Sequence, residues 1–324
     1  MTKYCMQVGL LMTVLLSVTT AFAADQEGGT VIRETPIYVS PDASAQKVGT
    51  ASRGRDIELV AERSTIDGKP WARVLAKVDV GLIGSKDISG WIDSRLLITT
   101  STANADQIIY GEAVDSERQA EERGGRRHAG EDAMRLYYRL YQYFPNSPLA
   151  GEALWRAADI RWQLEKSGIF TRPSFKQMSP EDRAQMDDET LKLVIKKFPN
   201  TKWADLARYD LIDNKVCGDW KGEASCPEKE SDIYEKYAHE HPQSPKAAES
   251  LYNAAWRQAA LVDIYKGDRQ RDKSEHARKK GLELAQELAG KSPEGDWKPR
   301  AANLIYALQQ NLVNYGNGNA SSSQ

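Results

Sequence analysis

Hydrophobic residues in the first third of the chain recur at every second position, in short stretches separated by turn-forming residues. Ile57, Leu59 and Ala61, for example, are each separated by one residue, and Asp67-Gly68 follows as a hairpin signal. This spacing extends over residues 31–98 and predicts about five or six short strands. So many strands in about 70 residues form a small, strongly bent sheet or barrel.

From residue 105 onward, hydrophobic residues recur at every third or fourth position, which predicts amphipathic helices. Ala133, Leu136 and Leu140 would lie on one helix face and pack against a neighbouring helix. The short polar stretch at residues 99–104 separates the two patterns, and we interpret it as a linker and domain boundary.

One short proline-containing phrase ends a helix-like stretch four times from residue 143 onward. The copies are Tyr143-Phe144-Pro145-Asn146-Ser147-Pro148, Phe198-Pro199-Asn200-Thr201, His241-Pro242-Gln243-Ser244-Pro245 and the weaker Lys291-Ser292-Pro293. Proline cannot continue a helix, and the Asn, Ser or Thr that follows can cap the next one. Because each copy joins a helix with a bulky apolar face to an Ala-rich helix, the repetition predicts stacked helix pairs, an architecture that commonly binds partners.

The four copies are separated by more residues than the ~34 of a strict tetratricopeptide repeat. The extra residues predict insertions, which fall at residues 169–180, at a loop between two cysteines, and at residues 265–280. The predicted helical domain is therefore an irregular stack of helix pairs.

Cys217 and Cys226 flank a polar, glycine-containing loop and are the two cysteines outside the first 23 residues. A disulfide between them suits an exported protein, and closing this short loop would stabilise the fold by roughly 2–3 kcal/mol. The alternative is a reactive or metal-binding thiol. No histidine or third cysteine stands at ligand spacing, which favours the disulfide.

The first 23 residues have the pattern of a cleaved signal peptide. Lys3 precedes an apolar stretch at residues 8–18, and Ala21-Phe22-Ala23 forms a cleavage site before Ala24. An uncleaved anchor is the alternative, but the apolar stretch is short for a membrane span. No cysteine follows the cleavage site as a lipid attachment point, so we expect a periplasmic or secreted protein that is soluble and not lipidated.

The charge of the exported chain argues against a general nucleic-acid binder. Of the 44 basic residues, 43 remain after the loss of Lys3, against 46 acidic residues, whereas nucleic-acid binders usually show a basic surplus. No later segment is apolar enough to cross a membrane, so no transmembrane segment is expected after signal cleavage. The expected domains are a signal peptide at 1–23, a sheet domain with its linker at 24–104, a helical domain at 105–314 and a disordered tail at 315–324.

The strand region carries a family resemblance. The stretches Ile37-Tyr38-Val39, Val48-Gly49-Thr50, Arg53-Gly54, Ile57-Glu58-Leu59, Trp71-Ala72-Arg73-Val74 and Gly90-Trp91-Ile92 stand in the order and spacing of a bacterial SH3-like (SH3b) domain. The Gly-Trp pair before Leu96-Leu97 is the most specific part. The resemblance implies a small SH3-like β-barrel that binds cell-wall peptides or targets an attached module.

Two features depart from that family, and both fall where ligands would bind. Ser40 stands where the family often has an arginine after the first strand, and residues 77–89 form a longer hairpin than usual. Tyr38, Trp71 and Trp91 are the candidate ligand-binding residues. The alternative is that these aromatic side chains fill the core of a barrel too small to have many other core residues.

The proline phrases resemble the tetratricopeptide-like (TPR-like) repeats of exported bacterial proteins, of the type found in the lipoprotein of the outer-membrane β-barrel assembly machine. Residues 141–153 fit the pattern Y-x-x-F-P-x-S-x-x-A-x-x-A, and residues 198–207 and 241–248 fit parts of it. The resemblance implies an irregular α-helical repeat stack that binds a protein or peptide. That lipoprotein carries an acylated cysteine, which this chain lacks, so the resemblance does not extend to β-barrel assembly.

No motif in the sequence indicates catalysis or a cofactor. The patterns H-E-x-x-H and G-x-S-x-G and a phosphate-binding Gly loop are absent from the sequence. His239 and His241 are two residues apart and would point to different faces of a helix, so we expect no metal site and no cofactor.

These features predict a non-enzymatic, exported scaffold or adaptor of the bacterial cell envelope. Its SH3-like domain would bind peptidoglycan or a wall-associated protein, and its helical repeats a protein or peptide partner, with no role for nucleic acid. One alternative is an exported cell-wall enzyme targeted by the SH3-like domain. Another is a structural repeat protein that assembles with itself.

Overall fold

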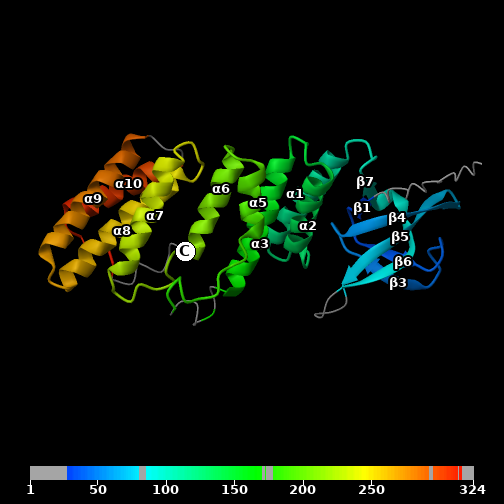
Figure 1. Cartoon of the computed structure of the whole chain (residues 1–324), viewed down its shortest axis with the longest axis horizontal. Coiled ribbons are helices and arrows are strands. Elements are labelled where there is room, and N and C mark those ends of the chain that lie inside the picture. Colours follow the sequence, from blue (N-terminus) through cyan, green and yellow to red (C-terminus); the bar gives the residue numbers. More distant parts are fainter. Residues whose placement is uncertain are drawn as a thin grey trace, which may run out of the picture.

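The protein is elongated, with a curled sheet at one end and a row of helices extending from it (Figure 1). The computed structural model describes residues 28–79, 85–169, 172, 178–291, 295–312, 314 and 315. The predicted signal peptide, residues 316–324 of the predicted tail and Ser292-Pro293 of the fourth proline phrase lie outside the described residues. The expected mixed β plus α fold is confirmed.

Seven described strands form one sheet in the order β3-β2-β6-β5-β4-β1-β7, and the neighbours are antiparallel. The strands are β1 (Gly28–Val31), β2 (Thr35–Tyr38), β3 (Lys47–Ala51), β4 (Asp56–Ile66), β5 (Lys69–Asp79), β6 (Ser85–Asp93) and β7 (Leu97–Thr99), with a 3-10 turn η1 (Ser94–Leu96) before the last. The spacing of hydrophobic residues did not predict β1, which is short and pairs with both β4 and β7.

Glycines and a tight turn shape the sheet. Asp67 and Gly68 both have positive φ angles, 52° and 72°, and they join β4 to β5 as the predicted hairpin turn. A Cβ atom on Gly90 would lie 2.5 Å from a methyl group of Ile37 and 2.7 Å from the carbonyl oxygen of Tyr38. Only glycine therefore allows β2 and β6 to approach this closely, and the approach helps the sheet to curl around its core.

The helical part begins beside the sheet and ends at the opposite end of the molecule (Figure 1). Its helices are α1 (Ala105–Glu121), α2 (Ala129–Tyr143), α3 (Ala150–Ile169), α5 (Glu189–Lys197), α6 (Lys202–Asp210), α7 (Ser225–Glu240), α8 (Ala247–Gly267), α9 (Arg271–Gly290) and α10 (Trp297–Gln309), with a 3-10 turn η2 (Leu211–Asn214) after α6. Helices α2 and α3, α5 and α6, and α7 and α8 are joined by the first three proline phrases.

The three described proline turns have nearly the same backbone geometry. The residue before each proline, Phe144, Phe198 or His241, ends its helix with φ between −128° and −126° and ψ between 53° and 58°. Proline disfavours the helical conformation in the residue before it, which explains where these helices end. The side chain of Thr201 caps α6 by accepting the backbone N–H of Ala204, as the sequence predicted. The hydroxyls of Ser147 and Ser244 accept the backbone N–H of the residue just before α3 and α8, so they close the turn and do not cap the helix.

One predicted insertion is not a separate loop. Residues 265–280 form the end of α8 and the beginning of α9, and these helices are 21 and 20 residues long. The extra residues lengthen two packed helices, because the hydrophobic spacing continues through Ala277, Leu284 and Ala285 into the core. The extra residues predicted at this place are therefore part of two helices.

The stretch at residues 99–104, interpreted from the sequence as a linker, is a compact turn. The backbone N–H of Thr99 donates to the hydroxyl of Thr102 at 3.0 Å, and the N–H of Thr102 donates to the carbonyl of Thr99 at 3.1 Å. In β7, Leu97 packs in the core of the sheet, whereas Ile98 packs in the core formed by α1, α2 and α3. The two cores therefore meet on opposite sides of one short strand.

Candidate binding surfaces

One side of α2 holds the sheet through three side chains at four-residue spacing. The guanidinium of Arg135 donates to the carbonyl of Arg53 at 2.9 Å, and that of Arg139 donates to the carbonyl of Gly54 at 3.1 Å. The hydroxyl of Tyr143 donates to the carbonyl of Gly29 at 2.8 Å. Residues four apart lie on one face of a helix, so α2 presents a continuous stripe of donors to the backbone of the sheet.

The turn at Gly54 fits closely against α2. Gly54 has a φ of 71°, and a Cβ atom there would lie 2.6 Å from the Cβ of Arg135 and 2.7 Å from the backbone nitrogen of Leu136. Nearby, Arg53 forms an ion pair of 2.5 Å with Glu112 of α1. A side chain at position 54 would push the turn away from the helix, so the close fit fixes how the sheet is oriented on the helices.

A cavity of 390 Å³ lies where this turn meets α2, α3 and α5. Its apolar wall includes Met134, Tyr138 and Leu193, and Arg139 and Arg161 lie at its polar side. The guanidinium of Arg161 pairs with Asp187. The cavity is a product of the junction between the sheet and the helices.

The three predicted aromatic residues lie on the face of the sheet opposite its core. Their neighbours in the sequence belong to that core: Ile37, Ala72 and Ile92. Because successive side chains of a strand point to opposite faces, Tyr38, Trp71 and Trp91 point away from it. Strand pairing sets Tyr38 directly opposite Trp91, and the ring of Tyr38 meets that of Trp71 edge-on at 5.8 Å. The structure thus brings the three candidates together.

The three rings differ in exposure. Trp71 is 2% exposed, with Tyr38 and the amino group of Lys69 against its ring, the latter 4.7 Å from the ring centre. Tyr38 and Trp91 are half-buried. Tyr38 and Trp91 are therefore the aromatic residues that a ligand can contact directly on this face, and Trp71 supports Tyr38 from the side.

Charged residues that the sequence analysis did not single out surround these rings. Asp93 pairs with Lys69 at 3.5 Å and with Arg95 at 2.7 Å, and the hydrogen bond from Arg95 lowers the pKa of Asp93. Two-residue spacing in the strands could have found them, because Lys69 lies two positions before Trp71 and Asp93 two positions after Trp91. We name Tyr38, Trp71, Trp91, Lys69 and Asp93 the outer face of the sheet.

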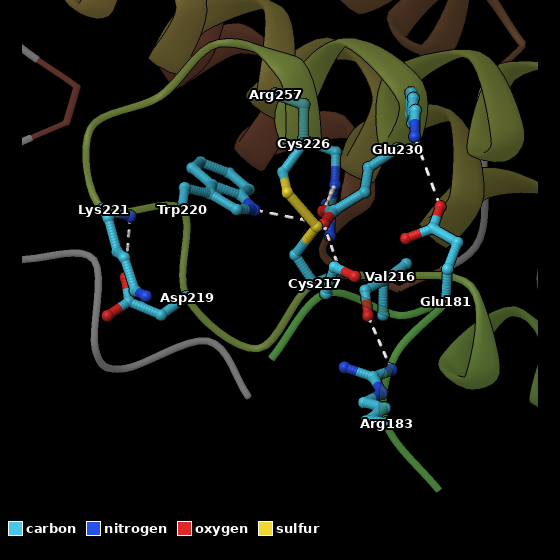
Figure 2. The surroundings of a disulfide bond; sticks show 12 residues. Glu181, Arg183, Val216, Cys217, Asp219, Trp220, Lys221, Cys226, Glu230 and Arg257 are labelled. Atoms are coloured by element: carbon cyan, nitrogen blue, oxygen red, sulfur yellow. Dashed lines mark hydrogen bonds and ion pairs between the residues drawn. A yellow bond between two sulfur atoms is a disulfide. The ribbon is translucent and has the colours of Figure 1, made fainter. Parts of the chain in front are cut away.

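The loop between Cys217 and Cys226, called the cysteine loop, is closed as predicted (Figure 2). The sulfur atoms of Cys217 and Cys226 are 2.05 Å apart, as in a disulfide. Glu230 of α7, 1% exposed, accepts hydrogen bonds from the backbone N–H of Cys217 at 2.8 Å and from the indole of Trp220 at 3.1 Å. The guanidinium of Arg257 of α8 donates to its other oxygen at 2.7 Å, so the buried charge is paired and hydrogen-bonded on both oxygens.

Residues 181–183, which directly follow the first predicted insertion, pack beside the same loop. Arg183, 5% exposed, donates to the carbonyls of Asp213 and Val216 at 2.9 and 2.7 Å, and burial lowers its pKa (Figure 2). Glu181 pairs with Lys229 of α7 at 3.3 Å. The segment before α5 is therefore tied to the residues on both sides of the cysteine loop. The sequence analysis missed Arg183, Glu230 and Arg257, which resemble surface residues in the sequence.

Carboxylates with raised pKa values lie between α3 and α6. Burial raises the pKa of Asp210 to about 8, and the nearby charge of Asp159 adds to the rise. The indole of Trp155 donates to Asp210 at 3.4 Å. Asp159 also has a raised pKa because of burial. Both carboxyl groups are therefore harder to ionise than ordinary aspartates.

The two histidines considered as metal ligands lie against different carboxylates. His239 is 3.2 Å from Glu287, and His241 is 2.9 Å from Asp205. Within the described ranges, no three His, Cys, Asp or Glu side chains gather where they could hold a metal ion. None of the helices in these ranges is long and apolar enough to cross a membrane.

No protein-family model matches the chain, and no curated protein matches it significantly. The SH3-like and TPR-like resemblances rest on the sequence motifs and on no detected relative. The arrangement of side chains is consequently the basis for inferring what the protein binds.

Proposed function

We propose that the protein is a non-enzymatic, exported scaffold of the bacterial cell envelope. The sheet is an SH3-like domain that binds the cell wall or a wall-associated protein through its outer face. The helices are a TPR-like stack that binds a protein partner. The protein thereby connects the wall to that partner.

The placement of the half-buried Tyr38 and Trp91 on the face of the sheet opposite its core is the observation that carries the proposal. The sheet has a complete aliphatic core without them, so their size is not needed to fill it. Aromatic rings beside paired charges offer a ligand both an apolar surface and hydrogen-bonding groups. Peptidoglycan, which combines sugars with short charged peptides, has both kinds of group.

The proline turns and the disulfide support the other parts of the proposal. Three helix pairs joined by turns of one geometry are the arrangement expected of a repeat stack, whose extended surfaces commonly bind partners. A disulfide between Cys217 and Cys226 is stable in an oxidising compartment, which favours export.

The wall-binding half is tested by co-sedimentation of the full chain with purified peptidoglycan. We expect the wild-type protein to be retained, and Trp91→Ala to reduce retention by at least roughly tenfold, the loss of about one aromatic contact in a binding site. Tyr306→Ala is the matched control, because Tyr306 is 59% exposed on α10, at the other end of the molecule. If the wild-type protein stays in the supernatant, the wall is not its ligand.

Export is tested separately by mass spectrometry of the protein recovered from a bacterial envelope fraction. A chain that begins at Ala24 is expected if the signal peptide is cleaved. Recovery of the uncut chain in the cytoplasm would contradict the exported location.

A further inference from the structure

The last described residues of the chain fold back onto α8. The backbone N–H groups of Asn314 and Tyr315 both donate to one carboxylate oxygen of Asp263, at 2.6 and 2.9 Å. A carboxylate that accepts two consecutive backbone N–H groups binds a peptide chain whatever its side chains are. Asp263 therefore fixes the path of the chain immediately after α10.

The side chain of Tyr315 inserts against the cysteine loop. Its ring lies 5.5 Å from that of Trp220, and its hydroxyl accepts the backbone N–H of Gly222 at 3.3 Å. Trp220 in turn packs on Trp256 of α8 at 5.2 Å. The backbone, the ring and the hydroxyl of Tyr315 are thus each in contact with the rest of the protein.

The residues that hold Tyr315 are themselves held firmly. The indole of Trp220 donates to the buried Glu230, and the disulfide closes the loop that carries both Trp220 and Gly222. The guanidinium of Arg257 lies 5.7 Å from the ring of Trp220 and 5.9 Å from that of Trp256. A site whose side chains are already positioned loses little conformational entropy on binding. We name Trp220, Gly222, Trp256 and Asp263 the aromatic clamp.

We propose that the aromatic clamp is a peptide-binding site that the chain's own Tyr315 occupies, and that a tyrosine-containing segment of the protein partner binds there in its place. This inference rests on the proposed partner-binding role of the helices and names the site and the chemistry of the ligand. The tail is attached to α10, so its effective concentration at the clamp is high, on the order of millimolar. The tail consequently blocks weak ligands and admits only those that bind more tightly.

The first test uses the tail itself as a probe. A fluorescent peptide with the sequence of residues 311–318 is titrated with the full chain carrying Tyr315→Ala, and binding is followed by anisotropy. We expect this variant to bind the peptide at least roughly tenfold more tightly than the wild-type chain, because the competing ring is gone. A peptide in which alanine replaces the tyrosine should not bind.

One variant of the clamp and one control variant outside it decide whether the binding is specific. Adding Asp263→Asn to the Tyr315→Ala chain should weaken peptide binding, because an amide accepts backbone N–H groups less strongly than a carboxylate. Asp268→Asn, at the exposed end of the same helix, is the matched control and should change nothing. Circular dichroism of each variant confirms that it is folded. Equal peptide binding by the wild-type and Tyr315→Ala chains, or no effect of Asp263→Asn, would overturn the proposal.

The nature of the partner segment is tested by selecting random seven-residue peptides on the Tyr315→Ala chain. We expect tyrosine to be enriched in peptides that the tail peptide displaces. If no displaceable peptide contains tyrosine, the clamp binds only the tail, and the partner part of the inference is wrong. Neither result affects the peptidoglycan experiment, which concerns the sheet at the other end of the molecule.

Discussion

At the junction between the sheet and α2, arginine side chains hold backbone carbonyls close to the surface, whereas at the cysteine loop a carboxylate and a guanidinium pair inside the protein. The side chains of Arg135 and Arg139 are 18% and 19% exposed, against 2% and 11% for those of Glu230 and Arg257. Removing one partner of a buried pair leaves an uncompensated charge inside the protein. Close to the surface, water would solvate such a charge. The cysteine loop should therefore be the more sensitive of the two to the loss of a charge.

The two junctions also differ in how they are fixed. A covalent bond and a buried ion pair hold the cysteine loop, while the close approach of Gly54 to α2 holds the sheet. Steric fit should therefore contribute more to stability at the sheet junction, and the pairing of charges should contribute more at the cysteine loop. Each of the following substitutions tests one side of this contrast.

The largest effect is expected for Glu230→Gln. The substitution leaves Arg257 buried without its counter-charge, and the free energy of unfolding should fall by on the order of 3–5 kcal/mol. Urea denaturation followed by circular dichroism measures the loss. Glu223→Gln, on the exposed surface of the cysteine loop, is the control and should stay within about 0.5 kcal/mol of the wild type. Equal losses for the two variants would show that the buried pair does not stabilise the loop.

The next effect is expected for the double variant Cys217→Ser and Cys226→Ser. Opening the loop restores conformational freedom to the unfolded chain, so the free energy of unfolding should fall by roughly 2–3 kcal/mol. Addition of a reducing agent should lower the stability of the wild type by a similar amount and leave that of the variant unchanged. A reductant that destabilises both proteins equally would indicate an effect unrelated to the disulfide.

The third effect concerns the shape of the sheet junction and uses Gly54→Ala with Gly68→Ala as its matched control. Both glycines have positive φ angles, 71° and 72°, so alanine suffers the same backbone strain at each. A Cβ atom meets α2 only at position 54, whereas nothing lies within 4 Å at position 68. We expect Gly54→Ala to cost about 1–3 kcal/mol more than Gly68→Ala in thermal or urea unfolding. Equal costs would mean that the sheet is not held by this contact.

The last effect is expected for Asp210→Asn and appears as a change in the pH dependence of stability. The pKa of Asp210 is raised from 3.8 to about 8, so the folded state retains a proton that the unfolded state has lost across this interval. Stability should therefore fall as pH rises from about 4 to 8 and level off above it. Asparagine cannot ionise, so the variant should show a flatter profile and be more stable than the wild type at pH 9, where the wild-type carboxylate is charged in a buried place.

Thermal melting between pH 5 and pH 9 measures this difference. Asp219→Asn is the control, since Asp219 is exposed in the cysteine loop. A wild-type profile with the same slope as that of Asp210→Asn would show that Asp210 ionises normally.

Features that depend on neighbouring residues could be predicted from the sequence. Asp67-Gly68 supplies the positive φ angles of a hairpin, and the proline phrases end helices at Phe144, Phe198 and His241. Such features follow from backbone sterics within a few residues. They explain why the change from strands to helices and the three described proline turns were found correctly.

Features that depend on distant contacts could not be predicted. Glu230 stands in the charged run Glu228-Lys229-Glu230 and looks like a solvated residue, yet it is buried against Arg257, 27 positions away. The ring of Tyr315, assigned from the sequence to the tail, packs on Trp220. Residues 265–280 lengthen two helices because the packing of α8 and α9 decides where those helices end.

The sequence by itself determined that a region of strands precedes a region of helices, where the described proline turns lie and which two cysteines can pair. Periodicity and turn chemistry are local properties, and they act before the chain is packed. Only the tertiary structure decided that Tyr38, Trp71 and Trp91 share the outer face of the sheet, that Gly54 docks against α2, and that the cysteine loop meets the tail. These arrangements depend on which surfaces exclude water from one another, and that is settled only when the whole chain has folded.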